Sequence, residues 1–261
     1  MTGAFYLPTA DDDTFVATEH TAGPWDPAMQ HGGPPSALLA RAVEHVPSDR
    51  PATVVRLAVE ILGPVPVAEV TVHSRLSRPG RSVELVEAEL SAGGRPAVKA
   101  RAWRVRVRVA ELDLPADVAV PTASPPMPDH DTEYAGNWGG GFLHAMQLRF
   151  SEGSWTELGP ATAWGRQRVP LVAGEEPSGL QRLMVLADCG NGISSALPIA
   201  EWVFINPDLT VHLCRYPVGE WMCLQAATTA DPSGFGVATS TLYDASGRVG
   251  HGAQSLFIDR R

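Results

Sequence analysis

The sequence predicts an α+β protein built from two halves of the same plan, each with one apolar helix and a set of antiparallel strands. Three observations lead to this prediction. Residues 111–141, which are rich in proline and glycine, divide the 261-residue chain near its middle. Both halves contain a helix candidate followed by runs of alternating apolar and polar residues. Residues 57–61 (LAVEI) also align with residues 209–213 (LTVHL), which indicates an internal duplication.

In the first half, a strand candidate ends near Pro24, and a helix is predicted over residues 32–46. Gly32-Gly33-Pro34-Pro35 opens this helix, and proline in the first turn is typical of a helix start. Strand candidates follow at 53–62, 68–76, 82–91 and 97–109. Turn signals at Arg78-Pro79-Gly80 and Gly93-Gly94 separate the last three, as antiparallel hairpins require.

The second half begins with strand candidates at 144–150 and 162–169. A helix is predicted to begin at Ser178, where Ser178 and Gln181 can form a capping box. Leu183–Ala187 is apolar on every side, so this helix must be surrounded by other parts of the protein. The remaining strand candidates are residues 202–214, 221–229, 236–243 and 249–258.

These elements predict an N-terminal domain at 1–110, a linker at 111–141 and a C-terminal domain at 142–261. In one arrangement, a sheet wraps around the helix of each domain. In the other, the chain forms a pair of ordinary α+β sandwiches with helices on one face. The pattern alone does not separate the two arrangements.

Composition excludes several classes of function. The net charge is −9 and the basic residues form no cluster, which disfavours nucleic acid as a partner. No apolar run approaches the ~20 residues of a membrane span, and Met1–Asp13 has no apolar core, so we expect a soluble, cytoplasmic protein. Phosphate-binding and dinucleotide fingerprints are missing, as is metal-ligand spacing, so we expect neither a cofactor nor a metal.

Asp188 is the most informative single residue. Leu180, Met184 and Asp188 share one stripe of the predicted helix, which places a carboxylate on an otherwise apolar face. A buried carboxylate is costly without partners, so Asp188 should have hydrogen-bond donors or a functional role. The alternative is that Asp188 caps the glycine-rich segment that follows it.

Two amide side chains are further candidates. Gln254 shares a strand face with Gly250 and Gly252, whose missing side chains leave room around its amide. The alternative is that Gln254 is simply an exposed residue on a strand. Asn206 precedes Pro207, which indicates a strand edge or a bulge. Strict alternation would turn Asn206 away from the core, so a bulge is needed to aim it inward; otherwise Asn-Pro is a simple turn.

Gly33 and His31 are candidates for contact with the substrate. The start of a helix offers unpaired N–H groups and a partial positive charge, so Gly33 is a candidate oxyanion donor. The same glycine could merely begin the helix. His31 adjoins the two glycines, although a lone histidine near a loop is usually structural or solvated.

Four short motifs in this order resemble the acyl-CoA thioesterase II family. They are Gly32-Gly33, Leu186-Ala187-Asp188, residues 206–215 and Gly252-Ala253-Gln254. The resemblance implies a double hotdog, in which two fused hotdog domains each wrap an antiparallel sheet around a long central helix. It also implies an enzyme that cleaves acyl-CoA to a fatty or other carboxylic acid and CoA by activated water. Assembly into a dimer or larger homo-oligomer is implied as well.

By the same resemblance, the family's catalytic Asp, Thr and Gln fall on Asp188, Asn206 and Gln254. Asparagine in place of threonine is a departure, although an amide both donates and accepts hydrogen bonds. Val54 and Arg101 occupy the positions equivalent to Asn206 and Gln254 in the first half, which implies one active site per chain. Asp188 would act as general base or as the anion that orients the water, and a covalent acyl-aspartate route stays open.

Three alternatives remain. A hotdog hydratase acting on enoyl-CoA would need a histidine beside the acid, and no histidine follows Asp188 until His212. A non-catalytic acyl-CoA-binding protein is compatible with the asparagine at 206. A serine hydrolase is disfavoured because the G-x-S-x-G elbow is missing.

Overall fold

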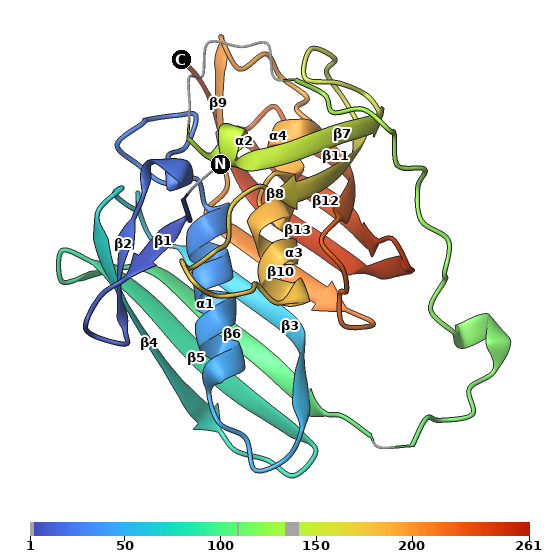
Figure 1. Ribbon diagram of the computed structural model, residues 1–261. Coiled ribbons are helices and arrows are strands. Elements are labelled where there is room, and N and C mark those ends of the chain that lie inside the picture. The colour runs from blue at the N-terminus through green and yellow to red at the C-terminus, as the bar shows by residue number, and fades with distance from the viewer. Residues whose placement is uncertain (1–2, 109, 134–140) are drawn as a thin grey trace.

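A computed structural model of the chain describes residues 3–108, 110–133 and 141–261 (Figure 1). Its helical elements are η1 Glu19–Thr21, α1 Gly33–His45, η2 Ala116–Val118, α2 Phe142–Ala145, α3 Gly179–Ala187 and α4 Gly190–Ile193. Its strands are β1 Tyr6–Pro8, β2 Thr14–Ala17, β3 Ala52–Ile61, β4 Glu69–Arg78, β5 Val83–Ala92, β6 Arg95–Arg106, β7 Met146–Glu152, β8 Ala161–Gln167, β9 Trp202–Ile205, β10 Asp208–Leu213, β11 Met222–Asp231, β12 Phe235–Asp244 and β13 Gly247–Arg260.

The strands form one sheet with the order β1-β2-β4-β5-β6-β3-β10-β13-β12-β11-β8-β7, and β9 pairs with the end of β13. The β3–β10 pair lies at the centre and joins the two halves of the chain, with Leu57 opposite Val211. Outward from this pair, the first half runs β6, β5, β4 and β2, and the second runs β13, β12, β11 and β8. The halves therefore repeat one arrangement about the β3–β10 junction.

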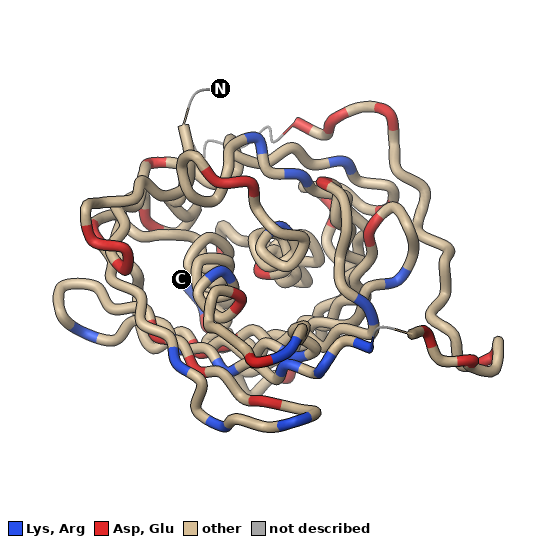
Figure 2. The backbone as a smooth tube through the Cα atoms, turned by 60° about the horizontal axis from the view of Figure 1, so that its bottom comes forward, with Lys and Arg blue, Asp and Glu red and all other residues tan. Residues whose placement is uncertain are grey.

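The two long helices lie side by side within the curved sheet. Figure 2 shows them nearly end-on, enclosed by the surrounding chain, and charged residues of both signs are interspersed around the outside. α1 packs on β3–β6, whereas α3 packs on α1, β8 and β11. All five residues of Leu183–Ala187 are buried. At the closest approach of the helices, a Cβ atom on Gly33 would overlap the carbonyl oxygen of Val185, so glycine is required there.

The start of α3 is tied to α1 by side-chain hydrogen bonds. Ser178 caps α3 as predicted, since its Oγ accepts from the Gln181 N–H at 3.1 Å. The reciprocal half of the expected capping box does not form, because the Gln181 amide donates to Glu44 of α1 at 3.0 Å. Glu44 also accepts from Ser178 Oγ at 2.8 Å. One carboxylate thus fastens the end of α1 to the beginning of α3.

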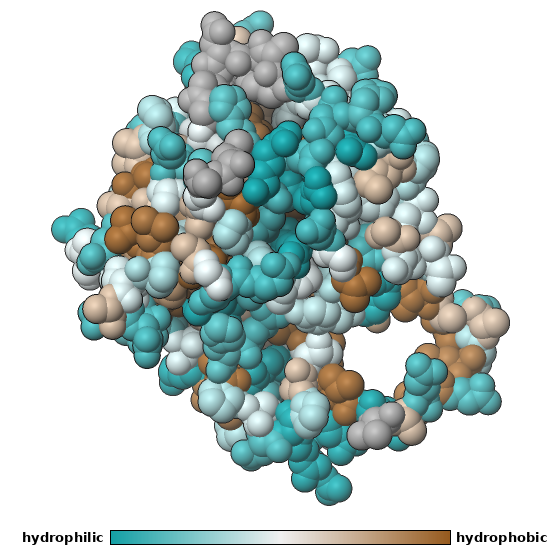
Figure 3. All heavy atoms as spheres, in the orientation of Figure 1, coloured by the Kyte–Doolittle hydropathy of each residue, from teal (hydrophilic) through white to brown (hydrophobic). Residues whose placement is uncertain are grey.

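The segment between the halves stands away from the body before it docks on the second half. Figure 3 shows the opening between this segment and the rest of the molecule. Further along, Pro121 O accepts from the Arg248 N–H at 3.0 Å, and Asp131 accepts from Arg149 Nε at 2.9 Å. Part of the predicted linker, residues 134–140, lies outside the described residues, as does Val109 at the predicted end of a strand.

Most predicted elements are confirmed within a few residues, and three differ. The strand expected to end near Pro24 ends at Ala17, as β2, and η1 follows it. The strand expected at 144–150 begins at Met146, because residues 142–145 form the short helix α2. The strand expected at 202–214 is divided into β9 and β10 at Asn206 and Pro207. Proline has no N–H for the ladder, which accounts for the break.

Candidate active site

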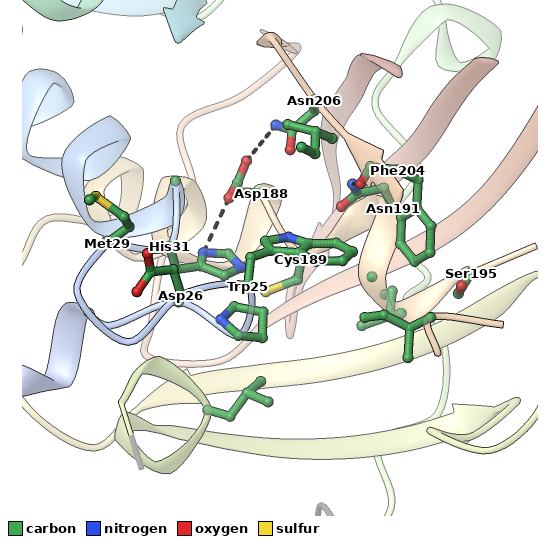
Figure 4. A pocket seen from close by; sticks show the side chains of 18 of the residues that line it. Trp25, Asp26, Met29, His31, Asp188, Cys189, Asn191, Ser195, Phe204 and Asn206 are labelled. Atoms are coloured by element: carbon green, nitrogen blue, oxygen red, sulfur yellow. Dashed lines mark hydrogen bonds and ion pairs between the residues drawn. The ribbon is translucent and has the colours of Figure 1, made fainter. Parts of the chain in front are cut away.

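A cavity of about 930 Å³ lies between the two halves of the chain (Figure 4). Its wall is mostly apolar and combines residues from both halves, including Trp25, Ile61, Val65, Leu158, Ile193 and Phe204. Asp188, His31 and Asn206 are among its polar residues. An apolar cavity with a few convergent polar groups is the usual form of a small-molecule site.

Asp188 lies at the end of α3 as its C-cap residue, with only 4% of its surface exposed. Its Oδ1 accepts from Asn206 Nδ2 at 2.8 Å and from Gln254 Nε2 at 3.3 Å. Its Oδ2 lies 3.1 Å from His31 Nδ1, so Asp188 stands between His31 and Asn206 in Figure 4. The structure therefore gathers three of the other predicted site residues around the Asp188 carboxylate.

Gln254 is buried on β13, with 2% of its surface exposed, so it is not an exposed strand glutamine. Its Oε1 accepts from the Asn191 N–H at 3.0 Å and its Nε2 donates to the backbone oxygen of Asp188 at 3.1 Å. Gln254, rather than Asp188, therefore accepts the hydrogen bond from the backbone N–H of the glycine-rich turn after α3. A Cβ atom on Gly190 would lie 2.7 Å from Gln254 Oε1, which explains the glycine there.

Asn206 reaches the site through a β-bulge, as its position before proline predicts. Thr210 of β10 pairs with Ala253, and Ile205 of β9 pairs with Phe257. Between these two pairs, the four residues 206–209 therefore oppose the three residues 254–256 of β13. The extra residue reverses the direction of the side chains that precede it, so Asn206 points at Asp188 instead of away from the core.

Gly33 does not supply a free oxyanion donor. Its N–H donates to His31 Nδ1 at 3.0 Å, and the residue is missing from the described cavity wall. Glycine is needed at position 33 because α1 approaches α3 closely there. His31 lines the cavity, and its ring stacks on Phe142 with centroids 3.9 Å apart and planes 6° from parallel. No local pattern in the sequence indicates that His31 of the first half contacts Asp188 of the second.

Burial changes the acid–base properties of this pair. It raises the pKa of Asp188, against the opposing effects of His31, Asn206 and Gln254. It also lowers the pKa of His31, against the opposing charge of Asp188. The raised pKa of Asp188 and the lowered pKa of His31 both favour the uncharged forms of these side chains. In that state, the carboxyl group and the imidazole nitrogen hold one proton between them. Burial and the Asp188 charge raise the pKa of the neighbouring Cys189 thiol, which therefore stays protonated.

The equivalent positions in the first half are apolar, and one of them must be corrected. Ala58 pairs with Arg101, whereas the corresponding Thr210 pairs with Ala253. The residue equivalent to Gln254 is therefore Ala102 and not Arg101. Arg101 lies on the outer face, with 59% of its side chain exposed, 3.4 Å from Glu87. The residue equivalent to Asn206, Val54, precedes a corresponding register shift in β3.

The described residues limit other kinds of site. Within residues 3–108, 110–133 and 141–261, three or more His, Cys, Asp or Glu side chains nowhere gather in a way that could hold a metal ion. Over the same ranges, every helix is too short or too polar to cross a membrane.

Comparison with known proteins assigns both halves of the chain. Residues 21–105 match the sequence model of the acyl-CoA thioesterase N-terminal domain, and residues 121–258 match that of the acyl-CoA thioesterase C-terminal domain. The comparison with curated proteins gives no significant match.

Solved structures of similar shape include three that span nearly the whole chain. A protein from Thermobifida fusca, described as a proposed thioesterase II, is 18% identical with a TM-score of 0.75, covering 98% of this chain and 95% of its own. A hotdog-fold protein of unknown function from Alicyclobacillus acidocaldarius is 16% identical with a TM-score of 0.72, covering 96% and 95%. An acyl-CoA thioesterase II from Mycobacterium marinum is 15% identical with a TM-score of 0.64, covering 97% and 94%. These similarities establish a hotdog fold.

Proposed function

The chain belongs to the acyl-CoA thioesterase family, and from that premise we propose how it hydrolyses the thioester bond of an acyl-CoA to a carboxylic acid and CoA. The observation that carries the proposal is the Asp188 carboxylate at the wall of an apolar cavity, surrounded by hydrogen-bond donors. The cavity takes the acyl group and holds the thioester carbonyl near Asp188.

Asp188 acts as general base on the attacking water, a role that contributes about 10²-fold to 10⁴-fold to the rate. Asn206 orients the same water. Its Nδ2 donates to Asp188, and among the described contacts its Oδ1 accepts no hydrogen bond, which leaves it available to water. The asparagine thus takes the place of the family's threonine. Gln254 is a positioning residue, because both ends of its amide are engaged by Asn191 and Asp188.

A single-turnover reaction in oxygen-18 water tests for a covalent acyl-aspartate whose anhydride is opened by water at the Asp188 carbon. With excess enzyme and direct attack, the label enters the released acid and none enters the enzyme. Label in the Asp188 carboxylate would require an acyl-aspartate intermediate and would replace the proposed mechanism.

We further propose that the hotdog fold is present twice, at 1–110 and 142–261, joined by a linker at 111–141. The mirrored strand order about β3–β10 and the two adjacent helices support this division. With Val54 and Ala102 in place of the amides, the first half has no second site. Three cysteines without a disulfide support a reducing compartment such as the cytoplasm.

A homo-oligomer is also proposed. Ile205, Phe257 and Phe235 lie opposite one another on three neighbouring strands and are 48%, 54% and 60% exposed. Such an apolar row favours contact with a second copy. Sedimentation should give a dimer or larger species, and a monomer at every concentration would contradict this.

The function is tested by measuring release of free CoA thiol over a panel of acyl-CoAs. The wild-type chain should hydrolyse at least one member, and Asp188→Asn should hydrolyse it about 10²-fold to 10⁴-fold more slowly. One observation favours measuring enoyl-CoA hydration in parallel: the structure supplies Asp188 with the neighbouring histidine that a hotdog hydratase needs. Hydration without hydrolysis would show that the acid–histidine pair serves the alternative reaction.

A further inference from the structure

We propose that His31 is a further catalytic residue, which shares one proton with Asp188 through Nδ1 and donates the proton on Nε2 to the sulfur of the departing CoA. The inference rests on the proposed function, since it needs Asp188 as the base. It assigns a role to a side chain from the other half of the chain, so the site is complete only when both halves contribute.

The hydrogen bonds around His31 determine its tautomer. A backbone N–H can only donate, and the Gly33 N–H points at Nδ1 from 3.0 Å. Nδ1 therefore presents its lone pair, and the proton of the neutral ring lies on Nε2. Asp188 Oδ2, 3.1 Å from the same nitrogen, then bonds to it as the carboxylic acid. Stacking on Phe142 holds the ring in this orientation.

Nε2 is the part of the ring available to the substrate. His31 lines the cavity with 14% of its side chain exposed, and none of the described residues makes a hydrogen bond to Nε2. The other titratable groups lining this cavity are Asp188 and Cys189 at the end of α3, Asp26 on the loop of His31, and Glu157. Asp26 accepts from the Ala28 N–H at 2.8 Å, which leaves Asp188 as the group bonded to the imidazole.

The proton balance closes within the pair. Asp188 passes its proton to Nδ1, and the carboxylate so formed removes a proton from water as the water oxygen bonds to the thioester carbon. When the carbon–sulfur bond breaks, its electron pair goes to sulfur, which takes the proton from Nε2. The proton that came from water now replaces, within the pair, the proton that went to CoA. Exchange of protons through the ring and the solvent then restores the starting tautomer.

The leaving group provides a test that a structural role would not satisfy. His31→Asn keeps an amide near the position of Nδ1 but removes the donor at Nε2. We expect kcat for the preferred acyl-CoA to fall by about 10²-fold, the lower end of the range for acid–base groups. With the thioester of an aromatic thiol, whose thiolate leaves without a proton, the loss should be within about threefold when both enzymes are compared at a pH above their acidic limbs. Equal losses for both substrates would overturn the proposal.

The pH profile gives a second readout. Wild-type kcat/KM should be bell-shaped, because activity needs the pair with one shared proton. His31→Asn removes the charge that lowers the pKa of Asp188, so the acidic limb should move to higher pH and the alkaline limb should disappear. An unshifted profile would overturn the proposal. His73→Asn, at an exposed position on β4, is the matched control and should behave as the wild type.

A measurement on the unaltered protein covers the case in which His31→Asn does not fold. Nitrogen-15 NMR of labelled histidines distinguishes the two neutral tautomers, and we expect His31 to carry its proton on Nε2 at neutral pH. The Nδ1–H tautomer would overturn the proposal. If the wild-type chain hydrolyses no acyl-CoA, the proposed function fails; if it does so and His31→Asn is equally active, only this inference fails.

Discussion

Asp188 is buried where its negative charge is penalised, but it has hydrogen-bonding and charged partners that offset this penalty. Desolvation penalises its ionised form, whereas Asn206, Gln254 and His31 supply the stabilising contacts. Because burial raises its pKa, the folded state binds a proton on Asp188 more tightly than the unfolded chain does. The stability that this proton provides is therefore complete below the pKa of the unfolded chain, near 3.8. It is lost as the pH rises through the higher pKa of Asp188 in the folded chain.

Asp188→Asn reproduces the shape and neutrality of the protonated acid without its ability to take a proton. We expect kcat to fall by about 10²-fold to 10⁴-fold. The thermal unfolding temperature at neutral pH should stay the same or rise, because the cost of ionising a buried carboxylate is removed. Steady-state kinetics and calorimetry check the two parts. Loss of stability with full activity would identify Asp188 as a structural residue.

Gln254→Ala should affect both stability and rate. It leaves the buried Asn191 N–H without its acceptor, which costs about 1–3 kcal/mol, and lets the Asp188 carboxylate move. Turnover should therefore fall, but less than in Asp188→Asn. Arg101→Ala is the control, because Arg101 lies on the exposed outer face of the sheet. A loss at Arg101 as large as that at Gln254 would place the chemistry elsewhere.

Asn206→Thr restores the family's residue and tests the departure directly. A threonine hydroxyl can donate to Asp188 and accept from water, as the amide does, so activity should stay within about tenfold of the wild type. Asn206→Ala removes both groups and should lose more. Thiol-release kinetics of the two variants make the comparison. If both lose activity equally, the amide itself is required.

The candidate site could be predicted from the sequence only where local features mark it. Asp188 was found because a carboxylate interrupts an apolar stripe, and Gln254 because glycines flank it on one strand face. The contact of His31 with Asp188 depends on how α1 approaches α3, which no local pattern encodes. Arg101 was matched to Gln254 by setting Gly94-Arg95 against Gly247-Arg248, which is one residue out. In the structure Arg95 and Gly247 hold the same place after their turns, so Ala102 is the residue equivalent to Gln254.

At the level of elements, alternation predicted the long strands well, and most errors lie where the ladder is irregular. The bulge at Asn206 and Pro207 divides a predicted strand, and it carries function because it turns Asn206 inward. α1 and its N-terminal glycines were also predicted. Of the two readings of Gly33, the structure disfavours the oxyanion donor, because the Gly33 N–H donates to His31 Nδ1 and the residue lies where α1 packs against Val185 of α3.

Gly33→Ala tests the close packing of α1 against α3. The added methyl group would overlap the Val185 carbonyl oxygen, and the helices can separate only by disturbing a buried interface. We expect a loss of about 1–3 kcal/mol of unfolding free energy, measured by denaturant titration. Gly63→Ala is the control, because nothing lies within 4 Å of its added Cβ. Equal stability of the two variants would show that the helix contact is looser than described.

For the whole molecule, the duplication and the order of helix and strands along each half were predicted from the sequence, but the joint between the halves was not. Period and turn signals describe elements within a half. The β3–β10 pair, the Glu44 contacts and the Tyr6 bridge to Val172 join residues far apart in the chain. The choice between a sheet wrapped around each helix and two sandwiches depends on such contacts, so pattern alone left it open.

The last prediction is that the two halves are inseparable. Residues 1–115 or 135–261 expressed alone would expose the β3 or β10 edge together with an apolar helix face, and free edges of this kind pair with other chains. Each fragment should be insoluble or self-associating in sedimentation experiments. Co-expression should restore thioester hydrolysis, because only the pair brings His31 to Asp188. A co-expressed pair in which the second fragment carries Asp188→Asn is the control and should be soluble but inactive. Two stable, monomeric fragments would contradict the continuous sheet, and activity of residues 135–261 alone would contradict a site that needs both halves.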